Sequence, residues 1–331
     1  MLTVWEGFLT LPDSLSIISI NRGVEMKKES HFHRIFNKIL NSIKKDYLLW
    51  LMVLPAVIEV FIFHYIPIYG VQLAFREYDF STGGFGGKWV GLKYFIQFFN
   101  SYQFKNILWN TFFISITNII IGFPIPIILA ILINQLRNQR TKEFLQTIVY
   151  MPHFISTPVM VGLLIVLLAP NTGIISKFLD ALFGIGNLNL LGEPRAFVPL
   201  YVLSDVWQHA GWNSIVYLAV LSNVDLELYE ACKVDGGGRW HTIRYIELPT
   251  LVPTMLILLV LNLGSILGVG FEKIYLMQNP LNIRVSEVIS TYVYKMGLLS
   301  AQFSYATAIG LFNTVINFTF LSIGNRISKK F

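Results

Sequence analysis

The stretch YEACKVDGGGRWHTIRYIELPTLVP, from Tyr229 to Pro253, is a polar interruption between two long apolar runs. It contains acidic and basic side chains, the only cysteine of the chain and three consecutive glycines. The residues before the glycines are good helix formers, and Leu226, Tyr229 and Cys232 fall near one helical face. Glycine accepts the left-handed conformation at which helices often end, and RWHTIRYIE can resume as a second helix. We therefore expect an elbow made of two short helices.

The composition of the chain is typical of a membrane protein. Of 331 residues, 54% are hydrophobic and 13% are charged, with a mean hydropathy of +0.59, whereas soluble domains have roughly 25% charged residues. Apolar runs close to the roughly 20 residues that cross a hydrocarbon core recur along the whole chain. We therefore expect an all-α membrane protein with six transmembrane helices in residues 46–328. The expected spans are about 48–72, 108–134, 147–169, 198–222, 250–270 and 304–325.

The Lys and Arg residues indicate the orientation of these spans. The larger share lies on the side that carries both termini and the elbow, and positive residues favour the cytoplasm. We therefore expect an N-in/C-in protein whose elbow is cytoplasmic and whose residues 1–45 form a cytoplasmic N-terminal segment. Residues 1–25 look appended to the native chain, with Met26 as an alternative start.

The elbow sequence resembles the signature loop of the permease subunits of binding-protein-dependent ABC importers. In that family Glu-Ala-Ala is followed by Asp-Gly-Ala and then by Ile-x-Leu-Pro and a further proline. Cys232 and Gly237 replace the usual alanines, and both are small. The matching residues here are Glu230, Ala231, Cys232, Asp235, Gly236, Gly237, Ile246, Leu248, Pro249 and Pro253.

Other segments resemble the carbohydrate-uptake branch of that family, of the polysaccharide and oligosaccharide type. They are LMVLPAVIEVFIFHYIPIYGVQLAF, WVGLKYFIQFF and NTFFIS, and the resemblance extends over roughly residues 45–328. It implies a type I ABC importer permease fold, in a multi-pass protein of the bacterial cytoplasmic membrane. It also implies partners: a second homologous permease, two cytoplasmic ATPase subunits that bind ATP and Mg, an extracytoplasmic solute-binding protein and an oligosaccharide substrate.

The resemblance also gives a role to the loop of residues 224–250. Such an elbow is a coupling helix, seated in a cleft of an ATPase subunit, and it transmits the closure of the ATPases to the membrane helices. The residues that would dock on the ATPase are Glu230, Ala231, Cys232, Asp235, Gly236 and Gly237.

Polar and aromatic residues inside the expected spans are candidates for the substrate pathway. Sugars stack on aromatic rings and pair their hydroxyls with amides, so such residues could line a common cavity. The alternative is helix packing through Trp bulk and Asn hydrogen bonds. Asp205 in the fourth span also calls for an explanation, because inserting an ionisable group into the membrane costs roughly 2.5–3.5 kcal/mol. The candidates are Trp207, His209, Trp212, Asn213, Asn262, Asn313 and Asn317.

Functions of other classes fit the sequence less well. No H-E-x-x-H or G-x-S-x-G motif is present, the histidines are not spaced for a metal site, and the cations form no stripe for nucleic acid. We therefore expect a non-catalytic subunit with no catalytic residue, no metal site and no cofactor of its own. The remaining alternative is a secondary transporter or channel for a small polar solute, although we see no paired repeats.

Overall fold

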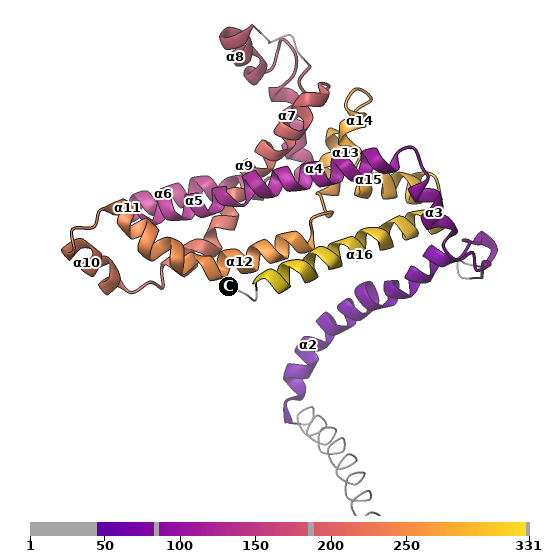
Figure 1. The fold of residues 1–331 in the computed structure, drawn as a ribbon, viewed down its shortest axis with the longest axis horizontal. Helices are drawn as coiled ribbons and strands as arrows, with labels where there is room; N and C mark the ends of the chain where they lie inside the picture. The colour runs from indigo at the N-terminus through magenta and orange to yellow at the C-terminus, as the bar shows by residue number, and fades with distance from the viewer. Residues whose placement is uncertain (1–44, 83–85, 185–188, 329–331) are drawn as a thin grey trace, which may run out of the picture. The chain divides into compact units, whose positions relative to one another are not determined.

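The computed structural model describes residues 45–82, 86–184 and 189–328, and they form a set of helices (Figure 1). Within these ranges the extended pairing is limited to an isolated antiparallel bridge between Arg76 and Trp89. The chain divides into two compact units, Met1–Gly70 and Val71–Phe331. The expectation of an all-α fold is confirmed for the described residues.

The described part of the first unit is one apolar helical stretch. It contains α2 (Tyr47–Val60) and a π-helical turn (Phe61–Tyr65), followed by a 3₁₀-helical segment (Ile66–Phe75) that continues into the second unit. Apart from Glu59, α2 is apolar all round its circumference, which is typical of a helix that faces lipid. The expectation that residues 1–25 are appended lies outside the described residues.

The second unit contains the remaining helices. Short helical turns lie at Phe80–Thr82, Met151–Phe154, Ile243–Glu247 and Lys295–Leu299. The α-helices are α3 (Lys93–Phe99), α4 (Phe104–Gly122), α5 (Pro124–Asn134), α6 (Gln139–Tyr150), α7 (Thr157–Leu167), α8 (Ile174–Phe183), α9 (Pro194–Leu221), α10 (Leu226–Val234), α11 (Arg239–Thr242), α12 (Leu248–Gly264), α13 (Phe271–Met277), α14 (Ile283–Ser286), α15 (Ile289–Tyr294) and α16 (Phe303–Ser328).

Long helices run side by side through the second unit. Helix α9 packs along α5 and α4, and α12 packs along α16 (Figure 1). Three buried apolar clusters hold them together. One joins α4, α7, α9 and α13 around Val202, another joins α3, α4, α15 and α16 around Phe98, and a third joins α5, α9 and α12 around Leu251. The elbow helices α10 and α11 lie at one end of this unit and α3 lies at the other.

Four helical stretches are long and apolar enough to cross a membrane, within the part of the chain that the structure describes. They are Tyr47–Phe75, Phe104–Asn134, Arg239–Gly264 and Phe303–Ser328. A fifth is a bent pair, Gln139–Phe154 followed by Thr157–Leu167, with an angle of 97° between its two arms. These stretches overlap five of the six expected spans.

The remaining expected span corresponds to α9, which has 28 residues but is not among the stretches apolar enough to qualify. Its polar side chains, which include Asp205, His209 and Asn213, lower its hydropathy. Most of these side chains face other helices of the chain, as described below. A helix of this kind can lie inside a bundle without an apolar surface all round.

The bend in the third expected span follows from its sequence. Pro152 and Pro158 lack the backbone N–H of a continuous helix, and Ser156 between them is extended. The side-chain amide of Gln208 on α9 donates to the carbonyl of Ile155 at 2.7 Å, which satisfies a backbone group that the bend exposes. Gly211 allows the backbone of α9 to approach that of α6, where a Cβ would meet the carbonyl of Val149. Helix α9 therefore stabilises the bend.

Candidate functional site

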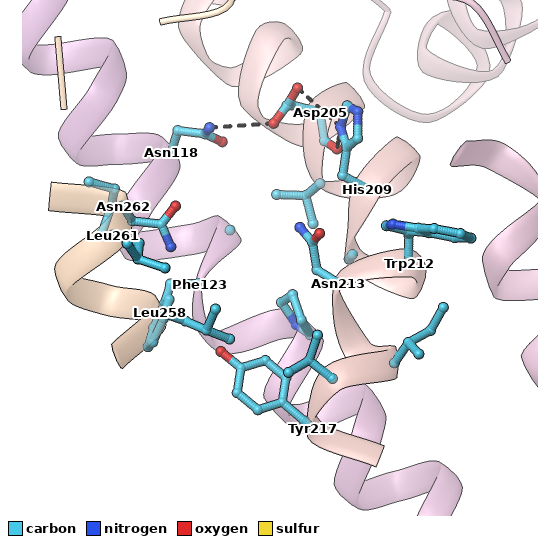
Figure 2. A pocket seen from close by; sticks show the side chains of 17 residues that line it. Asn118, Phe123, Asp205, His209, Trp212, Asn213, Tyr217, Leu258, Leu261 and Asn262 are labelled. Carbon is cyan, nitrogen blue, oxygen red and sulfur yellow. Dashed lines mark hydrogen bonds and ion pairs between the residues drawn. The ribbon is translucent and has the colours of Figure 1, made fainter. Parts of the chain in front are cut away.

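A cavity of about 530 Å³ lies between α4, α9 and α12 in the second unit (Figure 2). Its floor and walls are partly apolar, with Phe123, Tyr217 and Leu258 among the lining residues. A second cavity of about 360 Å³ shares Asn118, Asp205 and several other residues with the first. The two cavities therefore adjoin along one side of α9, and their shared lining is mostly polar.

Amide and aromatic side chains line the larger cavity. Asn118 comes from α4, Asn213 and Trp212 from α9, and Asn262 from α12. In Figure 2, Asn213 and Asn262 point into the space between these helices. Amides can donate and accept hydrogen bonds, and an indole ring offers an apolar face. This combination suits a ligand that carries many hydroxyl groups on an apolar ring frame.

A charged cluster lies at the boundary between the two cavities. One carboxylate oxygen of Asp205 is 3.4 Å from Lys273 Nζ and 3.4 Å from His209 Nδ1, and the other accepts from Asn118 Nδ2 at 3.4 Å. The side chain of Lys273 is only 5% exposed, and that of Asp205 is 23% exposed. Because Asp205 and Lys273 are largely buried, each charge needs the other. An unpaired charge in this position would cost free energy. Asp205 therefore holds α9, α4 and α13 together.

The aromatic wall of the cavity extends to the bend between α6 and α7. The ring of His153 stacks on Trp212, with centroids 4.5 Å apart and planes 7° apart, and lies 5.6 Å from the ring of His209. The Nδ1 atom of His153 is buried and has no hydrogen-bond partner among the described residues. The stack fixes the plane of Trp212 at the edge of the cavity.

The structure brings together four of the seven candidate pathway residues: His209, Trp212, Asn213 and Asn262 line the larger cavity. The other three lie elsewhere. The side chain of Asn317 accepts a hydrogen bond from the backbone N–H of Leu267 at 2.9 Å, just beyond the end of α12, which is the helix-packing alternative. Asn313 and Trp207 do not line either cavity, and Trp207 is 54% exposed.

Sequence reasoning missed Asn118, His153 and Lys273. Lys273 lies in residues 271–303, between the fifth and sixth expected spans, and is a residue of α13. The available signal was Asp205, because a carboxylate in an apolar span calls for a cation nearby. The sequence does not indicate which cation this is, because Asp205 and Lys273 are separated by 68 positions.

The elbow has the expected two arms. Helix α10 ends at Val234, and Gly236 has a φ of +80°, which is the left-handed conformation that favours glycine. The second arm, α11, continues through a π-helical turn into α12 as one helical stretch, Arg239–Gly264. Glu230, Ala231, Asp235 and Gly236 are exposed, and Cys232 and Gly237 are partly buried.

The two departures from the usual signature, Cys232 and Gly237, lie against each other. A Cβ added at Gly237 would be 2.5 Å from Cys232 Sγ and 2.7 Å from the Cys232 carbonyl oxygen. The backbone N–H of Gly237 donates to that same carbonyl at 2.8 Å. Gly237 therefore leaves room for the sulfur atom of Cys232, which a Cβ at this position would meet.

The described residues include no group of three or more His, Cys, Asp or Glu side chains that could hold a metal ion. The cavity between α4, α9 and α12 consequently offers amides, rings and one ion pair for binding a ligand.

Comparisons with known proteins place the chain in a family. Residues 122–331 match the model of the binding-protein-dependent transport system inner membrane component. The chain is 41% identical over 293 residues to the polygalacturonan/rhamnogalacturonan transport system permease protein YteP of Bacillus subtilis (strain 168), which covers 88% of this chain and 91% of that protein. It is 38% identical to protein LplB of the same organism, over 88% of this chain and 91% of that protein.

Two solved structures are similar. One is the crystal structure of a bacterial ABC transporter involved in the import of the acidic polysaccharide alginate; one of its chains matches with a TM-score of 0.81 and 39% identity, over 88% of this chain and 99% of that chain. The other is a bacterial alginate ABC transporter in complex with an alginate pentasaccharide-bound periplasmic protein, with a TM-score of 0.79 and 40% identity, over 88% and 96% of the chains. The chain belongs to the family of inner membrane components of binding-protein-dependent transport systems, as a multi-pass protein of the cytoplasmic membrane.

Proposed function

We propose that this chain is the permease subunit of an ATP-driven importer of oligosaccharide fragments of an acidic polysaccharide. Its relative YteP is named for polygalacturonan and rhamnogalacturonan transport, and two similar structures are those of alginate transporters. Polygalacturonan and alginate are both polymers of uronic acids. The shared chemistry of these polymers supports a substrate with carboxylate and hydroxyl groups on sugar rings.

The cavity between α4, α9 and α12 is the candidate for the sugar-binding part of the pathway. Its volume of about 530 Å³ falls within the roughly 300–1,000 Å³ of small-molecule sites. The indole of Trp212 offers a face for a sugar ring, while Asn118, Asn213 and Asn262 can bind hydroxyl groups.

The observation that carries the proposal of ATP-driven coupling is the continuity of the elbow with a membrane helix. The stretch Arg239–Gly264 is one helical rod, so a displacement of the elbow at Gly236 moves α12 and hence one wall of the cavity. The elbow also exposes large apolar side chains, which favours docking on another protein. They include Leu226, Leu228, Val234 and Trp240.

The partner that docks on this surface is a cytoplasmic ATPase subunit. Its contacts would come from the exposed and partly buried residues of the elbow, and it would bind the ATP and Mg that power the cycle. Two such ATPases, a second homologous permease and an extracytoplasmic solute-binding protein complete the transporter. The docking residues are Glu230, Ala231, Cys232, Asp235, Gly236 and Gly237.

The membrane topology of this proposal has six spans and an N-in/C-in orientation. Helix α9 is the fourth span, protected from lipid over much of its length by α4, α5 and α12. The excess of Lys and Arg on the side of the elbow supports its cytoplasmic location. The loops that contain α3 and α13–α15 then face the solute-binding protein.

Reconstitution tests the proposed function. Purified complex in proteoliposomes should take up fluorescent tri- to pentasaccharides of galacturonate or mannuronate only with the binding protein and ATP present. Neutral malto-oligosaccharides of the same length are the control for charge. Uptake driven by an ion gradient without any ATPase would instead favour a secondary transporter or channel and would contradict the proposal.

A further inference from the structure

A buried carboxylate lies where the elbow meets the bundle. Glu247 is 0% exposed and is the last residue of the π-helical turn that joins α11 to α12. Its Oε1 atom accepts hydrogen bonds from Asn134 Nδ2 at 2.7 Å and from Gln135 Nε2 at 2.9 Å. Both donors lie at the C-terminal end of α5. The carboxylate therefore ties the second arm of the elbow to α5.

These two hydrogen bonds satisfy only one oxygen of the carboxylate. The Oε2 atom of Glu247 is buried and has no hydrogen-bond partner among the described residues. A buried acceptor left unpaired costs free energy, and the C-terminal end of a helix disfavours negative charge. An apolar residue at this position would avoid both costs, but it would leave the amides of Asn134 and Gln135 without their acceptor. The second oxygen is thus available for a further donor.

The first arm of the elbow provides a neighbouring hydroxyl group. Tyr229 of α10 lies with its Oη atom 3.4 Å from Asn134 Nδ2, which is the same amide group that donates to Glu247. Burial and then the negative charge of Glu247 raise the pKa of Tyr229, so its hydroxyl keeps its proton and can donate it in a hydrogen bond. Tyr229 also directly precedes Glu230 of the docking surface. One cluster therefore joins three elements: the end of α5, helix α10 and the N-terminal end of α12.

We propose that Glu247 is the positioning residue through which movement of α10 reaches α5 and α12, with the Tyr229 hydroxyl moving onto Oε2 when the ATPases close. The inference rests on the proposed function and deepens it. In the present conformation Asn134 bridges Tyr229 and Glu247. A small displacement of α10 exchanges this bridge for a direct hydrogen bond, which gives the elbow two discrete arrangements.

Two conservative variants test this role. Glu247→Gln keeps the shape and an acceptor for Asn134 and Gln135, but it removes the charged hydrogen bond with the Tyr229 hydroxyl and leaves at most a neutral one. Tyr229→Phe keeps the ring and removes only the hydroxyl. Each should leave assembly and ATP hydrolysis intact and lower the ratio of sugar transported to ATP hydrolysed by about tenfold, the scale of one hydrogen bond to a charged group. The double variant should lose little more than either single variant, because both remove the same interaction.

The matched control is Tyr65→Phe, which removes a hydroxyl from an exposed tyrosine of the first apolar helical stretch, outside the elbow. It should leave the ratio unchanged. If Glu247→Gln fails to assemble, Tyr229→Phe decides the matter. Wild-type coupling with both variants, or additive losses in the double variant, would overturn the inference. Absence of ATP-driven uptake in the wild-type complex would instead refute the proposed function.

Discussion

Gly236 and Gly238 lie two residues apart in the elbow but differ in backbone conformation. Gly236 has a φ of +80°, whereas Gly238 is extended, with φ −85° and ψ −178°. Neither position is crowded, because a Cβ at either would meet nothing within 4 Å. Backbone conformation alone therefore separates the two positions.

A pair of valine substitutions exploits this difference. Gly236→Val places a β-branched residue in the left-handed region at a cost of about 1–2 kcal/mol or more, and should remove most uptake. Gly238→Val should be tolerated, since extended backbone suits valine. Uptake assays normalised to the amount of each variant in the membrane fraction measure the outcome. Equal activity of the two variants would show that the left-handed turn does not matter to transport.

The Asp205–Lys273 pair is the other residue-scale feature with a clear energetic consequence. Removing the cation with Lys273→Met leaves a largely buried carboxylate with only His209 and Asn118 beside it, and should destabilise the fold by about 3 kcal/mol. Adding Asp205→Asn should recover much of the loss. Thermal unfolding of the purified complex in detergent measures both variants.

The control for this pair is an exposed one. Lys93 and Glu77 are 3.8 Å apart with side chains 55% and 54% exposed, so Lys93→Met should change stability by less than about 1 kcal/mol. If Lys93→Met and Lys273→Met reduce stability by similar amounts, burial of the Asp205–Lys273 pair contributes nothing to stability.

At the scale of elements, the two arms of the elbow fit each other through Cys232 and Gly237. Gly237→Ala should overpack this contact at a cost of about 1–3 kcal/mol and reduce uptake. Adding Cys232→Ala should restore part of the activity, because it removes the sulfur contact but leaves the contact with the Cys232 carbonyl. Uptake by both variants, compared with Cys232→Ala alone, gives the coupling between the two positions. A double variant no better than Gly237→Ala would refute the fit.

The elements differ in how well the sequence predicted them. The elbow is encoded locally, by helix formers on either side of three glycines, and its left-handed turn lies at the first of these glycines. The third span was expected over 147–169, whereas the structure bends it by 97° at Pro152 and Pro158, with support from α9. The fifth expected span ends at Gly264, where α12 ends, and not at residue 270, because the following residues turn toward α13.

The candidate pathway residues show the same division. His209, Trp212 and Asn213 are spaced so that they share a helical face, and all three line the cavity. Trp207 is five positions from Trp212 and falls on another face, which the helical period could have indicated. The placement of Asn317 depends on the rotation of α16 against α12, and Lys273 depends on a contact between distant segments. Local sequence therefore predicts neither the placement of Asn317 nor that of Lys273.

At the scale of the whole molecule, the account requires the elbow and the α3 region to lie on opposite sides of the membrane. Val234 in the elbow and Tyr102 beyond α3 are matched in exposure, at 87% and 90%. In a Cys232→Ala background, a membrane-impermeant maleimide should label Tyr102→Cys in intact spheroplasts. It should label Val234→Cys only after permeabilisation. Labelling of Val234→Cys from outside would reverse the proposed orientation.

The proposed transmission of force from an ATPase through the elbow to the cavity is tested by photo-crosslinking. Asp235→Cys in the Cys232→Ala background is coupled to benzophenone maleimide, and the complete transporter is irradiated with and without ATP. The account predicts a crosslink to the ATPase subunit, identified by mass spectrometry, together with loss of ATP-driven uptake in the crosslinked fraction. A crosslink only to lipid or to the solute-binding protein, or full uptake by crosslinked transporters, would contradict it.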